Sequence, residues 1–466
     1  MVFSSDVFLF LFLPIVLMVY YLPLIKERRF KNIWLFITSI VFYAWGEPVY
    51  VALILLSILV NWYFGKKIVD GVNSKAIVWA SIIYNLSFLF VFKYMSFVLS
   101  NLGFILNKDW DDLNVILPIG ISFYTFQSLS YVIDVYRSKN EGNVDKSSIL
   151  DVGLYIAFFP QLIAGPIVRY NTIAEEINNR NETWEDFTKG IKRFIFGLAK
   201  KILIANNVAV IANIAFESNI NSVAMAWLGA ICYTIQIYFD FSGYSDMAIG
   251  LGKLFGFHFE ENFNYPYISK TVTEFWRRWH ISLSTWFRDY VYIPLGGNRV
   301  SSSRHIINLA IVWLLTGIWH GANWTFVLWG VIYFVVQVLE KKCKYKVKIA
   351  FINHMYTMFI VIICWVLFRA DTVGIAFEYV GKMFGMNGVK LIDSIFIYYF
   401  NNMWIYIVLG IIFSFPTVRY ISDIMKSRMN RQVYDILGTF VIVVVFILTL
   451  AQVVSSSYNP FIYFNF

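Results

Sequence analysis

Apolar stretches, most of them long enough to cross a lipid bilayer, alternate with short charged or polar runs along most of the chain. They cover residues 7–24, 32–64, 75–100, 115–135, 149–168, 202–216, 224–254, 305–340, 349–368, 403–415 and 433–454. A transmembrane helix needs about 20 mainly apolar residues, because the hydrocarbon core of a bilayer is about 30 Å thick. The pattern therefore predicts an all-α polytopic membrane protein with about 11–13 transmembrane or re-entrant helices.

Interruptions refine this prediction. The Gly-Glu-Pro sequence at 46–48 splits the segment 32–64 into two short spans joined by an external turn. Two prolines and a glycine interrupt 149–168, which predicts a broken or re-entrant helix buried in protein. Residues 189–201 alternate basic and apolar side chains at helical spacing, as an interfacial helix does. Residues 262–304 are aromatic and basic without a continuous apolar run, so they do not predict a simple span.

Charged loops predict the sidedness of the chain. Cytoplasmic loops carry an excess of Lys and Arg, so the basic runs at 26–31, 66–67 and 341–348 are expected at the cytoplasmic face. The acidic loop 108–112 is expected outside, as is the N-terminus. The first apolar segment lacks a basic leader and a small-residue cleavage site, which predicts a retained first helix.

The composition supports a membrane protein and excludes most soluble classes. Of 466 residues, 59% are hydrophobic, 20% aromatic and 14% charged, whereas a soluble domain has roughly 25% charged residues. The net charge of +9 resides in short runs between apolar segments, which favours positive-inside topology over nucleic-acid binding. The three cysteines show no metal-ligand or disulfide spacing, so neither a metal site nor a disulfide framework is predicted.

His320 is the first candidate for chemistry, because it lies inside an apolar stretch at a break flanked by Gly317 and Gly321. If His305 marks the cytoplasmic boundary, a helix places His320 about 22 Å into the membrane. Ionisable groups at such depth usually face a cavity or a partner, and the two glycines allow close approach of another backbone or a substrate. The alternative is a structural histidine that is hydrogen-bonded to a carbonyl at the helix break.

His280 is the second candidate. It ends the sequence Phe-Trp-Arg-Arg-Trp-His, and on a helix Trp276 and Arg277 share its face. Arg277, Arg278 and Arg288 are suited to binding a phosphate or pyrophosphate. The alternative is an amphipathic helix at the lipid headgroups, where Trp and Arg are common.

Asp240 and Asp246 place two carboxylates inside an apolar segment. They are six residues apart, so they do not share a face of an unbroken helix. Gly243 between them favours a break in the helix. A structural hydrogen-bonding role is expected for them in preference to acid–base chemistry.

Six blocks of sequence together closely resemble the membrane-bound O-acyltransferase family, in particular its branch of bacterial alginate O-acetylation proteins. The blocks are 158–170 (FFPQLIAGPIVRY), 238–246 (YFDFSGYSD), 276–289 (WRRWHISLSTWFRD), 292–299 (YIPLGGNR), 317–324 (GIWHGANW) and 365–370 (WVLFRA). The likeness covers most of the chain. It implies one membrane-embedded domain over residues 1–466, with the motif-bearing core at about 115–370.

The resemblance also implies a ring-like bundle of tilted helices around a central tunnel. The catalytic histidine of the family corresponds to His320, and its second characteristic polar position corresponds to His280. The resemblance implies a bacterial inner-membrane location, acetyl-CoA as the cytoplasmic acyl donor and no bound cofactor. It further implies a polysaccharide acceptor outside the cell and a separate periplasmic or extracellular esterase-like protein that finishes the transfer. Membrane lipids are the remaining partner.

This function is chemically consistent with the residues, because acyl transfer to a hydroxyl needs a base and a neutral imidazole suits that task. The expected donor or tunnel residues are the aromatic and polar side chains of the matching blocks. They are Trp276, Arg277, Arg278, Trp286, Arg288, Asp289, Asp240, Ser242, Tyr244, Trp319, Asn323 and Trp324. Trp279 is expected to line the same apolar path.

Three other functions remain open from the sequence. Within the family they are D-alanyl transfer to teichoic acid and O-acetylation of peptidoglycan. From another class, a transporter or flippase also needs a polar tunnel, but it gives no reason for a pair of histidines at 280 and 320.

Overall fold

The computed structural model describes residues 1–24, 26–71, 73–108, 115–143, 147–218, 220–343, 349–386, 388–455 and 461–462. Within these residues the regular structure is helical, apart from one isolated bridge between Ser222 and Lys390. The all-α prediction is confirmed. The predicted acidic loop falls mainly on 109–112, and most of the basic run at 341–348 falls on 344–348, so both lie largely outside the described residues.

The chain forms two compact units, Met1–Phe194 with Met247–Glu260, and Ile195–Asp246 with Glu261–Phe466. Helices α10 (Trp184–Ala199) and α12 (Val223–Leu254) contribute residues to both units. The prediction of one domain over residues 1–466, like that of a ring around a tunnel, stays a prediction.

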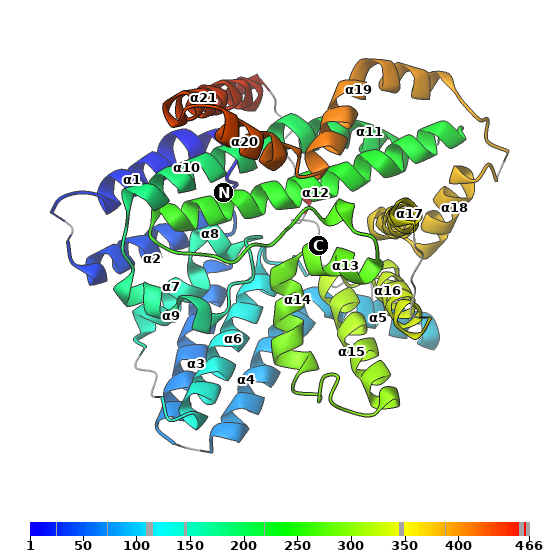
Figure 1. The fold of residues 1–466 in the computed structure, drawn as a ribbon. Helices are drawn as coiled ribbons and strands as arrows, with labels where there is room; N and C mark the ends of the chain where they lie inside the picture. The colour runs from blue at the N-terminus through cyan, green and yellow to red at the C-terminus, as the bar shows by residue number, and fades with distance from the viewer. Residues whose placement is uncertain are drawn as a thin grey trace. The chain divides into compact units, whose positions relative to one another are not determined.

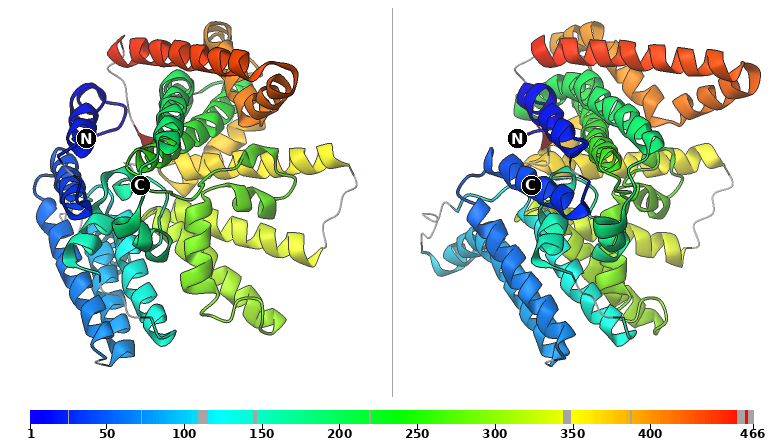
Figure 2. Two further views of the ribbon diagram at one scale, coloured as in Figure 1. Left: turned by 60° about the vertical axis from the view of Figure 1, so that its left-hand side comes forward. Right: turned by 90° about the vertical axis from the view of Figure 1, so that its left-hand side faces the viewer.

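The first unit contains the helices from η1 to α9. Their bounds are η1 Phe8–Phe12, α1 Leu13–Tyr20, α2 Arg28–Ala44, α3 Val51–Val69, α4 Ser74–Leu89, η2 Phe90–Tyr94, α5 Met95–Leu106, α6 Ile121–Asn140, α7 Ile149–Ala157, α8 Phe159–Leu162 and α9 Tyr170–Asn179. Helices α3, α4 and α6 lie side by side in every view (Figure 1, Figure 2). Asn61 of α3 and Asn85 of α4 exchange two amide hydrogen bonds of 3.2 and 2.7 Å, as polar side chains do between membrane helices.

The second unit contains the remaining helices. Their bounds are η3 Lys200–Ala205, α11 Asn206–Glu217, η4 Pro266–Ile268, α13 Val272–Arg278, α14 Ile281–Phe287, η5 Arg288–Tyr292, α15 Ser302–His320, α16 Trp324–Lys342, α17 Ala350–Arg369, α18 Val373–Met383, α19 Ser394–Ser414, α20 Thr417–Arg428 and α21 Arg431–Ser455. The segment 262–304 is built from short helices, which confirms that it is not a simple span.

Eight helices of the described residues are long and apolar enough to cross a membrane. They are Val51–Val69, Ser74–Leu106, Trp184–Glu217, Val223–Leu254, Trp324–Lys342, Ala350–Arg369, Ser394–Ser414 and Arg431–Ser455. The predicted 11–13 included re-entrant helices, and shorter or broken apolar segments such as Phe8–Tyr20 and α7 with α8 are not among these eight. The predicted splits of 32–64 and 149–168 are confirmed by the ends of α2 and α7.

Residues 189–201 are helical, as predicted, within one helix that continues from Trp184 to Glu217, and their position at the membrane interface stays a prediction. One expectation about a helix end is wrong. Gly243 does not break α12, which runs unbroken for 32 residues. A Cβ at Gly243 would lie 2.7 Å from the carbonyl oxygen of Gly197, so the glycine permits close helix packing.

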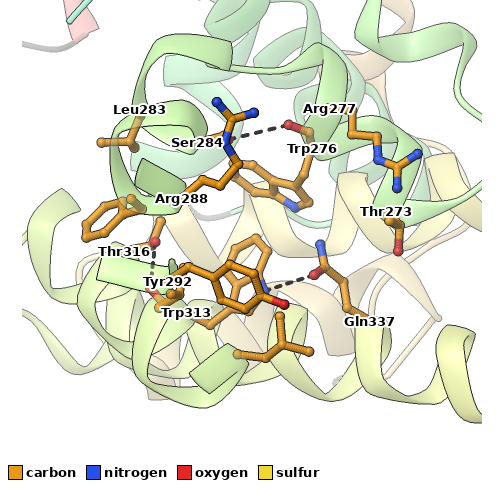
Figure 3. A pocket seen from close by; sticks show the side chains of 13 residues that line it. Thr273, Trp276, Arg277, Leu283, Ser284, Arg288, Tyr292, Trp313, Thr316 and Gln337 are labelled. Atoms are coloured by element: carbon orange, nitrogen blue, oxygen red, sulfur yellow. Dashed lines mark hydrogen bonds between the residues drawn. The ribbon is translucent and has the colours of Figure 1, made fainter. Parts of the chain in front are cut away.

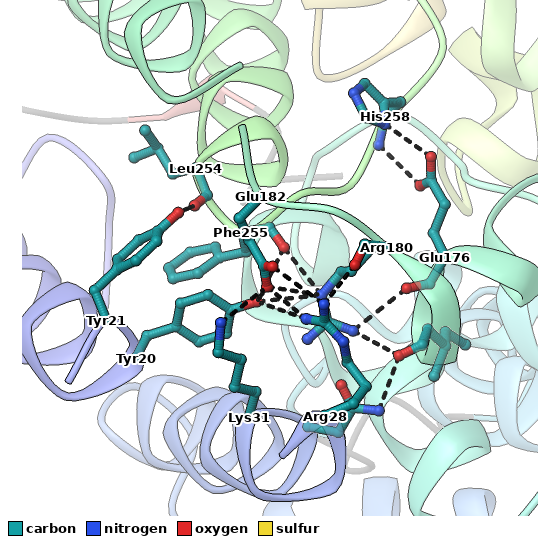
Figure 4. A network of polar contacts seen from close by, with 12 residues as sticks. Tyr20, Tyr21, Arg28, Lys31, Glu176, Arg180, Glu182, Leu254, Phe255 and His258 are labelled. Carbon is teal, nitrogen blue, oxygen red and sulfur yellow. Dashed lines mark hydrogen bonds and ion pairs between the residues drawn. The ribbon is translucent and has the colours of Figure 1, made fainter. Parts of the chain in front are cut away.

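A buried polar network fixes the ends of several helices in the first unit (Figure 4). The carboxylate of Glu182, between α9 and α10, accepts hydrogen bonds from Arg28, Lys31 and Tyr20. Arg180 donates from Nε to the Phe255 carbonyl at 3.0 Å. Burial raises the pKa of Glu182, but the hydrogen bonds and charges around it are stronger in sum and lower the pKa to about 2.

Candidate active site

His320 is the last residue of α15, which begins at Ser302 and has His305 in its first turn. The fifteen residues from His305 to His320 form one unbroken helix, which corresponds to about 22 Å of rise, as the sequence predicts. Gly321 is extended, and α16 begins at Trp324 after the cap residue Asn323. The predicted break therefore follows His320 directly.

Glycines bring the backbones of α15 and α16 into contact. A Cβ at Gly317 would lie 2.5 Å from the Phe326 carbonyl oxygen, and a Cβ at Gly330 would lie 2.6 Å from that of Trp313. No side chain fits at these distances, so both glycines are needed for the hairpin. The backbone that approaches Gly317 is that of α16.

The imidazole of His320 is buried among aromatic rings. Its side chain is 2% exposed, and its ring centroid lies 4.9 Å from Trp319, 4.9 Å from Trp329 and 5.4 Å from Phe368. Nδ1 lies 2.7 Å from the carbonyl oxygen of Thr316. A carbonyl only accepts hydrogen bonds, so Nδ1 carries the proton and, in the neutral ring, Nε2 carries the lone pair.

His280 lies between α13 and α14, outside the eight candidate spans, and is completely buried. Its backbone has φ +46, a left-handed conformation that costs a non-glycine residue roughly 1–2 kcal/mol. The ring contacts Phe241 and Trp319, with centroid distances of 4.7 and 5.8 Å. Burial lowers the pKa of His280 well below its ordinary value, and a proton on His320 would lower it further.

The structure thus brings together His280, His320 and Trp319, with Trp319 in contact with both imidazoles. It adds Asn262, whose side-chain oxygen lies 3.1 Å from Nδ1 of His280. Asn262 was not identified from the sequence, because no local pattern links it to a histidine eighteen positions later. No sequence signal apart from its polarity in an aromatic segment distinguishes it.

A pocket of about 230 Å³ lies in the same unit (Figure 3). Trp276, Arg277, Arg288, Thr316 and Gln337 are among the residues that line it. Thr316 also supplies the carbonyl that accepts from His320. Thr316 therefore links the pocket lining to the hydrogen bond that orients the His320 imidazole.

Aromatic side chains connect the pocket wall to His320. The ring of Trp276 lies 5.3 Å from that of Trp329, and the ring of Trp329 lies 4.9 Å from His320. Trp313 and Tyr333 contact both tryptophans. The wall between the pocket and the histidine is therefore apolar, with cationic groups at the pocket itself.

Glu340 positions the helix that carries Trp276 and Arg277. From the end of α16 its carboxylate accepts hydrogen bonds from the backbone N–H groups of Val272 and Thr273, at 2.7 and 3.0 Å. A carboxylate at a helix N-terminus satisfies donors that have no partner within the helix. No local sequence pattern indicates this contact, because the residues that it joins are 67 and 68 positions apart.

The other predicted donor or tunnel residues have different surroundings. Arg278 pairs with Glu274 at 3.0 Å and does not line the pocket. Asp289 pairs with Arg288 at 2.7 Å. Trp286 is buried against Phe287 and Tyr290.

Asn323 and Trp324 lie at the start of α16. The side chain of Asn323 caps the helix by accepting from Thr325 N at 3.0 Å and donates to the Asp371 carbonyl at 2.7 Å. Trp324 is 55% exposed. These contacts fix the turn that follows His320.

Asp240, Ser242 and Tyr244 are buried on α12. Asp240 forms an ion pair of 2.6 Å with Lys201, and both side chains are 2% exposed. The ring of Tyr244 stacks on Phe461 with centroids 4.6 Å apart. Asp240 thus has the structural contacts expected of it.

Comparison with known proteins supports the resemblance seen in the sequence blocks. The sequence model of the membrane-bound O-acyltransferase family matches residues 78–370. The chain is 43% identical over 402 residues to the probable alginate O-acetylase AlgI of Pseudomonas putida, covering 84% of this chain and 82% of that protein.

Two further relatives are named for other acyl-transfer activities. The chain is 35% identical over 427 residues to the peptidoglycan O-acetyltransferase of Helicobacter pylori, covering 84% of this chain and 81% of that protein. It is 31% identical over 240 residues to the teichoic acid D-alanyltransferase of Bacillus subtilis, covering 48% and 59%. The family match and the candidate spans agree: this chain is a multi-pass membrane enzyme that belongs to the membrane-bound O-acyltransferase family.

Proposed function

We propose that this enzyme transfers an acetyl group from cytoplasmic acetyl-CoA toward an extracellular polysaccharide, with His320 as the general base. The observation that carries this proposal is the hydrogen bond from Nδ1 of His320 to the Thr316 carbonyl. It places the lone pair on Nε2 of a buried neutral imidazole, which suits removal of a proton from a hydroxyl.

In the proposed step, Nε2 of His320 takes the proton of the acceptor hydroxyl while its oxygen attacks the thioester carbonyl. The new C–O bond forms, the C–S bond breaks, and the leaving thiolate takes the proton from the imidazolium. The products are an acetate ester and coenzyme A. In a second step, a separate periplasmic or extracellular esterase-like protein moves the acetyl group from this ester to a hydroxyl of the polymer, and the first acceptor regains its hydroxyl proton. The enzyme itself is proposed to act in the inner membrane of a bacterium.

The pocket lined by Trp276, Arg277 and Arg288 is proposed as the donor site. Arg277 is exposed, and the Arg288 side chain is 58% exposed, so both guanidinium groups are accessible to the phosphates of a donor. Each charge-assisted hydrogen bond contributes about 1.5–3 kcal/mol when partly desolvated. The aromatic wall that leads from Trp276 to His320 suits the less polar pantetheine arm.

The acceptor polymer is proposed from the relatives. The alginate and peptidoglycan O-acetylating proteins are covered over most of their length, whereas the D-alanyltransferase is covered over 59%. This difference favours acetyl over D-alanyl transfer. Alginate-like polysaccharide is the proposed acceptor, and peptidoglycan is the second candidate because of the 35% identical relative.

The test uses the purified chain in sealed proteoliposomes with radiolabelled acetyl-CoA on one side and oligosaccharide acceptors on the other. Release of coenzyme A thiol with label on an alginate oligosaccharide, directly or after addition of the extracellular partner, supports the proposal. Label on peptidoglycan fragments alone selects the second candidate. Thiol release only from a D-alanyl carrier protein overturns acetyl transfer, and movement of intact substrate without thioester cleavage indicates a transporter.

A further inference from the structure

Asn262 contacts the backbone on the C-terminal side of His280 through both its carbonyl and its side chain. The backbone carbonyl of Asn262 accepts from Ile281 N at 2.9 Å. Its side-chain oxygen accepts from Ser282 N at 3.2 Å and from Ser282 Oγ at 2.9 Å. A single buried asparagine thus contacts the two residues that follow His280. The left-handed conformation of His280 persists only when its surroundings enforce it.

The same contacts determine which atom of the Asn262 amide faces His280. The backbone N–H of Ser282 can only donate, so the atom that it contacts is the oxygen Oδ1 and not the nitrogen. Nδ1 of His280 lies 3.1 Å from that oxygen. It therefore carries the proton, and in the neutral ring the lone pair of His280 lies on Nε2.

We propose that Asn262 is a positioning residue, which fixes both the left-handed turn and the Nδ1–H tautomer of His280 and so makes Nε2 of this ring a hydrogen-bond acceptor. The role of Asn262 in turnover rests on the proposed function, whereas its effect on the turn and on the tautomer does not. His320 takes the hydroxyl proton in the proposed step, and Nε2 of His280 then serves only to accept a hydrogen bond from a reacting group. While it is neutral, His280 does not donate a hydrogen bond to the carbonyl oxygen.

The surroundings of His280 support this assignment. Its ring neighbours include Phe241 of α12 and Trp319 of α15, and a proton on His320 would act on it electrostatically. Neither ring neighbour supplies a carboxylate that would stabilise an imidazolium. Asn262, which is neutral, orients the ring without adding a charge.

The test combines turnover with nitrogen NMR of the full chain in nanodiscs, labelled with ¹⁵N-histidine. The chain has five histidines, and a His280→Asn variant assigns the signal of His280. For the wild type we expect a neutral ring with the proton on Nδ1. In Asn262→Ala that signature is expected to be lost, and turnover to fall more than tenfold with the KM for acetyl-CoA within about twofold.

Asn264→Ala is the matched control, because the Asn264 side chain is exposed and only its backbone contacts Arg278. It should keep both the signature and the turnover. Asn262→Asp retains the acceptor oxygen but adds a charge, so we expect His280 to become doubly protonated at neutral pH. This variant decides the matter if Asn262→Ala does not fold.

An Nδ1–H signature that survives in Asn262→Ala, or a neutral His280 in Asn262→Asp, overturns the proposal. So does wild-type turnover in Asn262→Ala. The NMR result does not depend on turnover. A wild-type chain that releases no coenzyme A from acetyl-CoA would therefore refute the proposed function while the role of Asn262 was still decided.

Discussion

Trp319 lies perpendicular to His320, with ring centroids 4.9 Å apart and an angle of 89° between the planes. The same indole lies 5.8 Å from the ring of His280. One side chain therefore limits the movement of both imidazoles.

Replacement of Trp319 by Ala should release both rings and lower turnover by about 100-fold, since a displacement of about 1 Å in an active site has an effect of that size. Trp319→Phe retains an aromatic ring and should lose less than tenfold. The measurement is the initial rate of coenzyme A release by each purified variant. Equal rates for Trp319→Ala and the wild type would exclude this role.

His320→Ala should lower acyl transfer by at least about 100-fold while the protein remains folded and inserted, because general-base catalysis contributes about 10²–10⁴. His354→Ala is the control for loss of an imidazole, since His354 contacts the Ser269 carbonyl and no residue of the candidate site. Acetylated product and protein level are measured in the same membranes. Normal product from His320→Ala would remove this residue from the mechanism.

Arg277→Ala should raise the apparent KM for acetyl-CoA more than it lowers kcat, because Arg277 lines the pocket and is expected to bind donor phosphates. A loss of 1.5–3 kcal/mol corresponds to roughly 10- to 100-fold in affinity. Arg304→Ala, which removes an exposed arginine outside the pocket lining, should leave the KM unchanged. Titration of acetyl-CoA against the variants in nanodiscs makes the comparison, and an unaltered KM in Arg277→Ala would rule out this donor contact.

Removal of one charge of the buried Lys201–Asp240 pair should lower the stability of the protein more than removal of both charges. Asp240→Asn leaves the Lys201 charge buried without its counter-ion, which typically costs about 3–5 kcal/mol. The double variant Lys201→Met with Asp240→Leu removes both charges and should recover most of the lost stability. Thermal unfolding in detergent measures the effect. A double variant less stable than either single one would contradict it.

Glu182 should contribute stability that depends on pH. The folded-state pKa, about 2, is below the ordinary 4.5, so the contribution is complete above about pH 4.5 and is lost as the pH falls through 2. The shift corresponds to about 3 kcal/mol at neutral pH. The difference in Tm between the wild type and Glu182→Gln should therefore be large at pH 7 and smaller at pH 3. A difference that is constant over this range would contradict the assignment.

Local patterns were sufficient to predict the helical fold, the unbroken helix from His305 to His320 and the break after it. Fifteen residues of helix between His305 and His320 follow from the spacing alone, and Gly317 indicates close approach without identifying its partner. The contacts of Asn262 and Glu340 could not be predicted, because they join segments separated by at least eighteen residues. Gly243 was misinterpreted for the same reason, since only the neighbouring helix reveals why it is small.

The carboxylate of Glu340 connects the α15–α16 hairpin to α13, so the hairpin contacts two parts of the candidate site. The closed end carries His320, and the open end holds α13 and its pocket residues through the hydrogen bonds of Glu340. The close contacts at Gly317 and Gly330 pack α15 and α16 backbone to backbone, so the two helices are expected to move as one body. A tilt of the hairpin would therefore move His320 and α13 together, which couples the proposed base mechanically to the proposed donor pocket.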